Sequence, residues 1–426
     1  MKKYDSYKDS GIEWIGEIPS HWDVTRIKYK FQIGRGRVIS NEDLVEDAIY
    51  PVYSSQTLNN GCLGHIETFD FDDKLITWTT DGANAGTVFL REGKFNCTNV
   101  CGTLKGKSDD VIPEFDYYFL QYATQFYKRP DTNGAKIMNN EMAVILSLKL
   151  STEEQTAIAK YLEHKTTQID KLIAKKEQFI QLLEEERVAV INQAVTKGLD
   201  PNVSMKDSGI EWLGQIPKHW EVNKIKSVTK KIGSGVTPKG GAEIYELTGI
   251  PLLRSQNVYF DGFRLDNVAY ITREIHDSMK NSQVLFGDVL LNITGGSIGR
   301  CYYVTNEFEE ANVNQHVCIV RPNERIITEF LYYVLSSTLG QQQIDLCQTG
   351  GNREALNFEQ LKNFFLILPS VEEQYELILQ LKKSLKAVSL TIIKSIQEIE
   401  LLKEYKTALI SEVVTGKIDV RNEKLN

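Results

Sequence analysis

Residues 8–29 read KDSGIEWIGEIPSHWDVTRIKY, and residues 206–227 read KDSGIEWLGQIPKHWEVNKIKS. Fifteen of these 22 positions are identical, and the two stretches align without a gap. Chance does not produce such a match in a chain of ordinary composition, so the chain contains two copies of one module. This duplication decides the architecture, because each copy is expected to form the same structural unit.

A second repeat follows each motif and has the pattern of a helix. Residues 153–200 align without a gap with residues 372–419, and both stretches begin with Glu-Glu-Gln. Apolar residues recur there at spacings of three, four and seven, which indicates one apolar face on a helix. They are Ile169, Ile173, Ile180, Leu183, Val190 and Ala194 in the first copy, and Val388, Ile392, Ile399, Leu402, Leu409 and Val413 in the second. Glycines near the ends, Gly198 and Gly416, are typical of helix C-caps.

A helix from about Gln168 to Thr196 would be roughly 43 Å long at 1.5 Å per residue, and its apolar stripe needs a partner. The equivalent helix of the other copy is the expected partner, in a two-stranded antiparallel coiled coil that gives the chain a pseudo-two-fold axis. The alternative, in which each helix packs only on its own domain, stays open.

The segments between the motifs, residues 30–150 and 228–369, share only a skeleton. Runs of β-branched and aromatic residues alternate there with Gly, Asn and Pro, which favours strands. Three short segments correspond by position: Gly34–Gly36 with Gly233–Gly235, Thr80–Gly86 with Thr294–Gly299, and Asn96–Asn99 with Asn312–Gln315. Repetition of the frame with divergence of the content is expected of two copies of one scaffold that bind different targets.

The predicted fold class is therefore α+β, with two strand-rich globular domains joined by two long antiparallel helices. Two domains also suit a chain of 426 residues, which is too long for one compact core. The predicted bounds are a first strand-rich domain over 1–150, a central helical region over 151–200, a second strand-rich domain over 201–369, a distal helical region over 370–420, and a tail over 421–426.

Composition excludes several classes of protein. No apolar run approaches the ~20 residues of a membrane span, and the first residues lack the hydrophobic core of a signal peptide, so we expect a cytoplasmic protein without a membrane partner. The six cysteines are scattered and are expected to be reduced, buried thiols. The nearest approach to a metal site is Cys97 and Cys101 with Cys62 and His65. No second Cys or His pair stands at zinc-finger spacing, so no metal is expected.

The net charge of −8 is unusual for a protein that binds nucleic acid, because neutralisation of phosphates supplies most non-specific affinity. Residues 30–150 hold 12 basic against 16 acidic residues, and residues 228–369 hold 12 against 15. Local patches or a partner would have to supply the positive field.

The repeated motifs, together with TGGNREALNFEQLKNF (349–364) and VVTGKIDVR (413–421), closely resemble the specificity subunit of type I restriction-modification systems. The resemblance covers essentially the whole chain. It implies two target recognition domains that each read one half of a split double-stranded DNA sequence, with the helices as a ruler between them.

The resemblance also implies a non-catalytic subunit that recruits two methyltransferase (modification) subunits and, in the full complex, two restriction (translocase) subunits. No cofactor is expected in this chain; S-adenosylmethionine, ATP and Mg are expected on the partner subunits.

Candidate base-reading residues are those that suit the edges of the bases: Arg or Lys for guanine, Asn or Gln for adenine, and Ser or Thr for either. We looked for them in polar, Gly-punctuated loops. The candidates in the first domain are Arg35, Arg37, Ser55, Gln56, Thr80, Asn84, Asn99, Asn133 and Lys136. The candidates in the second domain are Ser234, Thr237, Lys239, Arg254, Gln256, Asn257, Ser297, Arg300, Asn314, Gln315, His316, Asn352 and Arg353. For any one of them, a solvated turn residue is the alternative.

The repeated aromatic and proline residues are expected to do something else. Trp14, Trp22, Trp212, Trp220, Pro19 and Pro217 recur although the domains between have diverged, so we expect them to fasten each module to the helices. His21 and His219 each precede a Trp and are expected to have a hydrogen-bonded structural role.

No motif for nucleotide phosphates, metalloprotease zinc or a hydrolase nucleophile is present, nor is the Asn-Pro-Pro-aromatic run of amino-methyltransferases. Two alternatives to a DNA-specificity subunit stay open. One is a coiled-coil scaffold whose variable domains bind proteins. The other is an enzyme with an unrecognised site near Asp81, Asn84 or Cys97.

Overall fold

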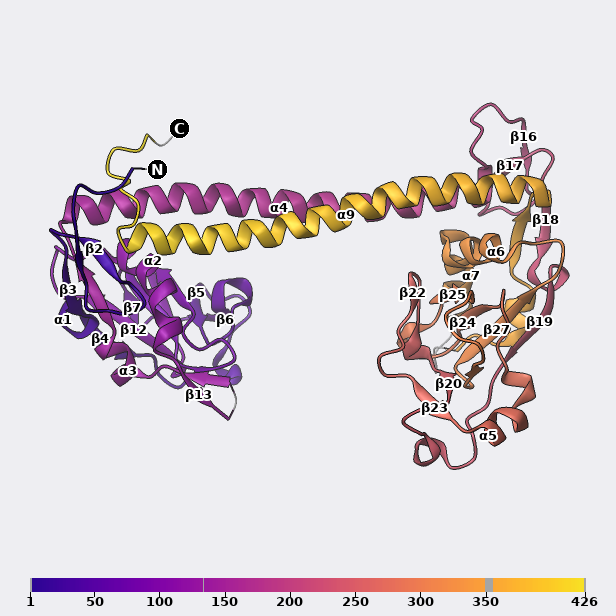
Figure 1. The fold of residues 1–426 in the computed structure, drawn as a ribbon, viewed down its shortest axis with the longest axis horizontal. Helices are drawn as coiled ribbons and strands as arrows, with labels where there is room; N and C mark the ends of the chain where they lie inside the picture. The colour runs from indigo at the N-terminus through magenta and orange to yellow at the C-terminus, as the bar shows by residue number, and fades with distance from the viewer. Residues whose placement is uncertain (1, 133, 349–354, 425–426) are drawn as a thin grey trace. The chain divides into compact units, whose positions relative to one another are not determined.

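The computed structural model describes residues 2–132, 134–348 and 355–424. The chain divides into two compact units: unit 1 is Met1–Glu177 with Ile396–Asn426, and unit 2 is Gln178–Ser395. Each unit contains one copy of the repeated motif, one strand-rich domain and one portion of each long helix (Figure 1). The predicted α+β fold with an internal duplication is confirmed.

The repeated motif forms the same hairpin in both units. The strands are β1 (Tyr7–Asp9) with β2 (Glu17–Pro19), and β16 (Met205–Asp207) with β17 (Gln215–Pro217). After the first strand, a carboxylate oxygen of Asp9 accepts the Gly11 N–H at 2.9 Å, and Asp207 accepts the Gly209 N–H at the same distance. Both glycines have left-handed φ angles, +69° and +73°, which explains the repeated Asp-Ser-Gly.

The strand-rich domains share a central four-stranded antiparallel sheet. In unit 1 its order is β10-β8-β12-β4, and in unit 2 it is β25-β24-β27-β19. The strands are β10 (Val88–Arg91), β8 (Leu75–Thr79), β12 (Cys101–Gly106) and β4 (Phe31–Arg35), and in unit 2 β25 (Cys301–Tyr303), β24 (Val289–Asn292), β27 (Val317–Pro322) and β19 (Thr229–Ser234). The order of equivalent strands is identical, so this sheet is the duplicated frame.

A second sheet is duplicated around one parallel pair, β5 with β11 in unit 1 and β20 with β26 in unit 2. Unit 1 has the order β6-β5-β11-β7 and unit 2 has β23-β20-β26. The strands are β5 (Tyr50–Tyr53), β6 (Cys62–Ile66), β7 (Phe71–Asp72) and β11 (Lys94–Cys97), with β20 (Ile250–Leu253), β23 (Ala269–Ile271) and β26 (Asn312–Val313). Two-stranded sheets pair β3 (Asp23–Arg26) with β15 (Leu146–Lys149), and β18 (Glu221–Lys224) with β28 (Phe365–Leu368).

The remaining elements distinguish the two units. Unit 1 has a three-stranded sheet of β9 (Asp81–Gly82), β14 (Gly134–Lys136) and β13 (Arg129–Asp131), and helices α1 (Ile27–Lys30), α2 (Pro113–Ala123) and α3 (Asn139–Val144). Unit 2 has the hairpin β21 (Val258–Tyr259) and β22 (Gly262–Phe263), and helices α5 (Arg273–Ser278), α6 (Thr328–Ser336), α7 (Thr338–Gln348) and α8 (Phe358–Lys362).

The two long helices are α4 (Thr152–Lys197) and α9 (Val371–Val414). Within unit 1 they are antiparallel: Lys406 Nζ lies 2.7 Å from Asp170 Oδ1, and Lys176 pairs with Glu398 (Figure 1). The predicted apolar stripe is buried or half-buried at all twelve positions. Helix α4 begins sixteen residues earlier than the expected start at Gln168 and, with 46 residues, is about 69 Å long. The start at Thr152 agrees with the helical region predicted over 151–200, and the turns before Gln168 pack in the domain core rather than in the coiled coil.

The Glu-Glu-Gln at the start of each helix joins that helix to its domain. The Gln155 side chain accepts the Ile112 N–H at 3.1 Å and donates to the carbonyls of Asp110 and Leu150, both at 3.0 Å. Gln374 makes the same three bonds, to Ile327, Arg325 and Pro369. Both glutamines are buried, so the loop before α2 or α6 and the helix start are held by one side chain.

The motif residues pack at the ends of the long helices. Trp22 and Pro19 lie against Gly416 at the end of α9, and Trp220 lies against Gly198 at the end of α4. Both tryptophans are fully buried. A Cβ on Gly416 would lie 2.4 Å from Pro19 Cδ, so the helix end requires glycine for space as well as for its φ of +73°. The expected fastening role is confirmed for Trp22 and Trp220.

The other two tryptophans pack differently from the expectation. Trp14 stacks on Phe126 with ring centroids 4.7 Å apart and also meets Phe119 and Tyr122 of α2, so it contacts the strand-rich domain of its own unit rather than only the long helices. Trp212 is 43% exposed and lies beside α7.

Among the described residues, no helix has the length and hydropathy of a membrane span.

One buried polar cluster is present in unit 1 and absent from the same place in unit 2. Lys30 Nζ lies 2.5 Å from Asp116 Oδ1, and Ser147 Oγ donates to the same carboxylate at 3.3 Å. Burial raises the pKa of Asp116 while Lys30 opposes that shift. The equivalent residues in unit 2 are Val228, Leu331 and Leu366, all fully buried. The frame therefore accepts either an ion pair or an apolar trio.

Replacement of Lys30 alone by Val should lower the free energy of unfolding by about 3–5 kcal/mol, because the buried Asp116 carboxylate loses its counter-ion. The triple change to the residues of unit 2 (K30V, D116L, S147L) should leave stability unchanged or raise it by up to about 4 kcal/mol. Urea unfolding monitored by tryptophan fluorescence measures both. A triple variant less stable than K30V would contradict the equivalence of the two units here.

Candidate nucleic-acid interface

In unit 2 the predicted segments meet at the ends of the central strands. The Asn314 N–H donates to the Leu253 carbonyl at 3.1 Å, and the Gly235 N–H donates to the Asn314 carbonyl at 3.1 Å. The Ile293 N–H donates to the His316 carbonyl at 3.0 Å. Residues 234–239, 253–257 and 293–300 therefore surround residues 312–316, although they are far apart in the sequence.

Side chains in this cluster are hydrogen-bonded in series. The Thr237 hydroxyl donates to Gln315 Oε1, and Gln315 Nε2 lies 3.0 Å from His316 Nε2. The other ring nitrogen of His316, Nδ1, lies 2.6 Å from Thr294 Oγ1. Thr237 and Gln315 are exposed and His316 is half-buried. The series holds an amide and an imidazole in fixed orientations at the surface, which suits contact with base edges.

Two arginines of unit 2 lie over tyrosine rings. The Arg300 guanidinium carbon is 4.8 Å from the Tyr259 ring centroid, and that of Arg254 is 5.6 Å from the Tyr245 centroid. Arg254 also donates to the Asn267 carbonyl at 3.0 Å. The two arginines were predicted from the sequence, and the tyrosines were not. The available signal was Tyr259, which stands two residues after the Arg-Ser-Gln-Asn group.

Unit 1 brings its predicted segments together in the same way. The Thr98 N–H donates to the Tyr53 carbonyl at 2.8 Å, and the Gly36 N–H donates to the Cys101 carbonyl at 3.0 Å. The Thr80 N–H donates to the Val100 carbonyl at 3.0 Å. Residues 34–37, 53–56, 80–86 and 96–101 thus form one loop cluster.

Two arginines of this cluster are held by neighbours, and so is Lys136, which pairs with Asp81 in the adjoining sheet. The Arg35 Nε donates to the Asn99 carbonyl, and the Arg37 Nε lies 2.8 Å from Asp70 Oδ2. Lys136 Nζ lies 2.9 Å from Asp131 Oδ2 and 3.7 Å from Asp81 Oδ2, and its hydrogen bond to Asp131 raises the pKa of Lys136. The Arg35 contact leaves both terminal nitrogens of the guanidinium unused by that bond, as a bidentate contact with guanine requires.

The backbone hydrogen bonds show which of the segments matched by position in the two halves of the sequence are structurally equivalent. Asn96 and Asn312 occupy the same place in the parallel pair of each unit, so that match is confirmed. Gly36 and Gly235 are also equivalent: a Cβ would lie 2.2 Å from the Cys97 carbonyl oxygen in one and 1.6 Å from the Val313 carbonyl oxygen in the other. Both positions need glycine because another loop crosses there.

The match of Thr80 with Thr294 is wrong by one residue. The Gly86 N–H donates to the Thr79 carbonyl, and the Gly299 N–H donates to the Asn292 carbonyl, which makes Thr79 equivalent to Asn292. Thr80 therefore corresponds to Ile293, and Asp81 to Thr294. The identity of the two threonines misled the alignment, because the constraint acts on the backbone and not on the side chain.

The structure corrects the expectation of base contact for buried candidates. Thr80 is fully buried, and its hydroxyl donates to the Val100 carbonyl at 3.0 Å. Asn257 is 1% exposed, with its side chain bonded to the Arg254 N–H and the Arg264 carbonyl. Asn314 is buried as well and accepts the His316 N–H at 3.0 Å. These side chains shape the loops and do not face solvent.

The other candidates lie on the surface or close to it. Asn84, Asn99, Lys239 and Gln256 are exposed, and Ser55, Gln56, Ser234 and Ser297 are half-buried. Gln56 donates to the Cys62 carbonyl, and Ser297 Oγ accepts from Asn292 Nδ2 at 3.2 Å. Asn133, Asn352 and Arg353 lie outside the described residues.

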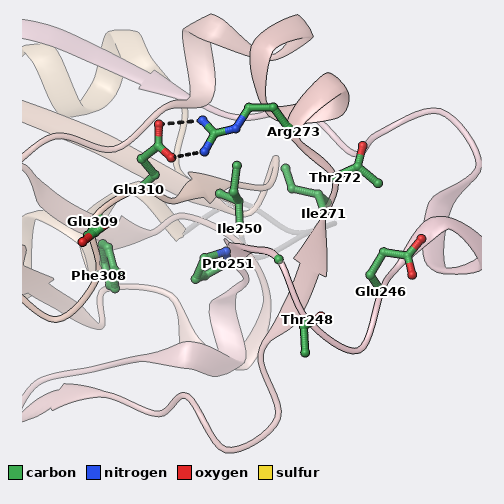
Figure 2. Close-up of a pocket in the computed structure, with 11 residues that line it drawn as sticks. Glu246, Thr248, Ile250, Pro251, Ile271, Thr272, Arg273, Phe308, Glu309 and Glu310 are labelled. Atoms are coloured by element: carbon green, nitrogen blue, oxygen red, sulfur yellow. Dashed lines mark hydrogen bonds and ion pairs between the residues drawn. The ribbon is translucent and has the colours of Figure 1, made fainter.

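A pocket of unit 2 away from the candidate loops does not suit a nucleic acid. It has a volume of about 550 Å³ and is lined by Ile250 and Pro251 at the start of β20 (Figure 2). The candidate loop of residues 254–257 follows the end of that strand. Its charged residues are Glu246, Glu309, Glu310 and Arg273, and Arg273 makes two bonds with Glu310, of 2.8 and 2.6 Å. Its excess of carboxylates repels phosphate.

Residues considered for a metal or a catalytic centre are placed as follows. Cys97 and Cys101 are buried, while Cys62 is half-buried and His65 is exposed. In the part of the chain that the structure describes, no group of three His, Cys, Asp or Glu side chains is arranged to hold a metal ion. His21 Nε2 lies 3.0 Å from Glu154 Oε2 and His219 Nε2 lies 2.9 Å from Glu373 Oε2, so the expected hydrogen-bonded role is confirmed for both.

Comparison with known families gives one match, in two copies. The model of the type I restriction modification DNA specificity domain matches residues 19–182 and 217–401. The two matched segments correspond to the two copies of the module.

Curated proteins similar to this chain are described as specificity subunits of type I restriction enzymes. The MjaVIII specificity subunit of a type I restriction enzyme from Methanocaldococcus jannaschii is 27% identical over 95% of each chain. The EcoBI specificity subunit from Escherichia coli is 31% identical over 53% of this chain and 48% of its own length.

Solved structures show the fold. A chain from a structure of the type I R-M system, described as addressing complex assembly and conformational transition, has a TM-score of 0.72 at 13% identity and covers 94% of this chain and 99% of its own. The HsdS subunit from Thermoanaerobacter tengcongensis has a TM-score of 0.54 at 15% identity, with 94% and 98% covered.

The crossing of loops at Gly235 can be tested directly. Gly235→Ala places a Cβ against the Val313 carbonyl and should displace the loop of residues 312–316, lowering the free energy of unfolding by about 1–3 kcal/mol. Gly233→Ala, two residues earlier on β19, has no atom within 4 Å of the new Cβ and should change stability by less than about 1 kcal/mol. Chemical unfolding compares the two variants. Equal losses would show that the close approach is not what requires glycine.

Proposed function

Because this chain belongs to the type I restriction-modification DNA specificity family, we propose that it selects the DNA sequence on which a modification and restriction complex acts. The observation that carries the proposal is the pair of loop clusters. Each stands on the same duplicated frame, and their polar side chains differ between the units. One frame with two different surfaces suits a target made of two different half-sites.

The two clusters offer different chemistry. Unit 1 presents Arg35, Arg37 and Asn99, of which the arginines suit guanine. Unit 2 presents Gln315 and His316 with arginines stacked on tyrosine rings. We assign the first half-site to unit 1 and the second to unit 2. Helices α4 and α9 each continue from one unit into the other, which supports their role as the element that sets the spacing of the half-sites.

The chain is proposed to bind and position, while partner subunits carry out the reactions. The partners are two methyltransferase subunits and, in the full complex, two restriction subunits, with S-adenosylmethionine, ATP and Mg bound by them. The duplication supports recruitment of two copies of one partner, since each unit offers the same motif hairpin and helix ends. Both domains carry more acidic than basic residues. Contacts of the methyltransferase with DNA phosphates would supply the positive charge that these domains lack.

A protein-binding scaffold is not favoured, because the family model covers both strand-rich domains and not only the helices. An enzyme with a site near Asp81, Asn84 or Cys97 gains no support from the geometry. Cys97 is fully buried, and Asp81 lies 3.7 Å from Lys136.

The proposal predicts that cells with this gene methylate adenines in one bipartite motif and that the motif loses methylation when the gene is deleted. Genome-wide mapping of methylated adenine measures this. Loss of no motif, or of a motif without two separated halves, would refute the proposal.

The assignment of half-sites predicts a selective effect. Gln315→Ala should relax one half of the motif while leaving the other half unchanged, at a cost of about 1–3 kcal/mol in discrimination. Arg35→Ala is the matched variant in unit 1 and should relax the opposite half. Methylation mapping of both variants decides the question, and relaxation of the same half by both would contradict the assignment.

The role of the helices predicts a change of spacing. Insertion of one heptad into both helices, after Glu177 and after Ser395, keeps the apolar stripe in register and lengthens each helix by about 10 Å. The methylated motif should keep both half-sites and change its spacer. An unchanged spacer would show that the helices do not act as the ruler.

A further inference from the structure

A buried arginine in unit 1, Arg91, lacks a hydrogen-bond partner for one of its guanidinium nitrogens within the described part of the chain. Arg91 is 3% exposed, and its guanidinium carbon lies 3.6 Å from the Tyr53 ring centroid and 4.3 Å from that of Phe89. Burial lowers the pKa of Arg91. Its Nη1 has no hydrogen-bond partner among the residues described. The two rings accommodate the charge, and Arg91 Nε donates to the Thr77 hydroxyl at 3.4 Å. Tyr53 and the thiols of Cys97 and Cys101 favour the charged form of Arg91.

The two thiols are neighbours. Cys97 ends β11 and Cys101 begins β12, and the Cys101 N–H donates to the Thr98 carbonyl at 3.0 Å, which closes a tight turn between them. Both side chains belong to one packed cluster, and the Cys101 thiol donates to the Tyr53 carbonyl at 3.6 Å. The interaction between the two thiols lowers the pKa of Cys101, with Arg91 adding to the effect, and raises the pKa of Cys97. One sulfur of the pair therefore ionises more readily than the other.

The second unit shows that the fold does not need this cluster. Strand register makes Leu253, Val304, Val313 and Val317 equivalent to Tyr53, Arg91, Cys97 and Cys101. All four are aliphatic and at most 2% exposed. The same frame is thus built in unit 2 without a cation, an aromatic hydroxyl or a thiol, so the frame does not require the cluster of unit 1.

We propose that Cys97 and Cys101 are a covalent modification site, which a hydroperoxide oxidises to a disulfide. The Cys101 sulfur attacks the peroxide, the O–O bond breaks, and a sulfenic acid forms with release of water or an alcohol. The Cys97 sulfur then displaces the hydroxyl group from Cys101, which leaves as water with the Cys97 proton. Two thiols lose two electrons and two hydrogens, and the peroxide is reduced.

The site lies directly under the candidate interface of unit 1. The Cys97 carbonyl accepts the Arg37 N–H at 3.1 Å, and the Cys101 carbonyl accepts the Gly36 N–H. Asn99, between the two cysteines, accepts from Arg35. Closure of the disulfide shortens the turn that carries Asn99 and displaces these contacts. Resting on the proposed function, the inference adds that oxidation weakens DNA binding through unit 1 and leaves unit 2 unaffected.

The first measurement concerns the chain alone. The protein is treated with hydrogen peroxide, the remaining thiols are blocked, and peptides are analysed by mass. We expect a Cys97–Cys101 disulfide, two hydrogens lighter than the thiol form and reversed by dithiothreitol. Cys62 and Cys347, which are half-buried, serve as reference thiols. Oxidation of the references while Cys97 and Cys101 stay reduced would overturn the proposal, whatever the chain does with DNA.

Variants taken from unit 2 test the mechanism. Arg91→Val should slow disulfide formation about tenfold, because the thiolate loses the nearby cation. Cys97→Val with Cys101→Val should abolish it, and Cys97→Ser alone serves if the double variant does not fold. An oxidation rate unchanged by Arg91→Val would overturn the role of the cation.

The second measurement uses the complex with the methyltransferase subunit. Peroxide should weaken binding to the bipartite target about tenfold, with recovery in dithiothreitol, and should leave the Cys97→Val, Cys101→Val complex unaffected. A disulfide that forms without any change in target binding would overturn the link to DNA. Absence of specific binding by the untreated complex would instead refute the proposed function, while the peptide result would stand.

Discussion

The packing of a tryptophan on the glycine that ends a long helix holds each unit together. Trp22 meets Gly416 in unit 1 and Trp220 meets Gly198 in unit 2, and in each case the indole fills the space that a side chain would take. The tryptophan belongs to the repeated motif, the glycine to the helix, and the buried core of the domain continues from both. A loop cluster can be displayed on this frame only because the frame is rigidly joined to the helix ends.

The duplication, the fold class and the helical regions were predictable from sequence because they depend on patterns: identical motifs, a helical apolar period, and glycines at helix ends. The role of Gln155, which ties the start of α4 to the loop before α2, was not predictable, because one glutamine leaves no periodic signal. The equivalence of Thr80 with Ile293 was not predictable either. The backbone is constrained there and the side chain is free to differ.

The candidate interface was predictable as a set of segments but not residue by residue. Polar residues of loops follow one of two courses: they turn inward to satisfy the loop backbone, as Asn257 does, or outward, as Gln315 does. Sequence composition is the same in both cases. Only the hydrogen bonds decide: Asn257 bonds within its own loop, to Arg254 and Arg264, whereas Gln315 bonds to Thr237, 78 residues away. The stacking of Arg300 on Tyr259 belongs to the same class of information.

Unit 2 consists of one continuous stretch of chain, Gln178–Ser395, whereas unit 1 needs Ile396–Asn426 as well as the first 177 residues. During synthesis on the ribosome, unit 2 can therefore complete its core before unit 1, although unit 1 begins first. The core around Trp22 includes Leu409 and Val413, and Trp22 packs against Gly416. At ~5–20 residues per second, these residues are synthesised tens of seconds after the first domain has emerged. The N-terminal domain is thus the last to close, and over that interval the apolar surface that α9 will cover is open to chaperones and to aggregation.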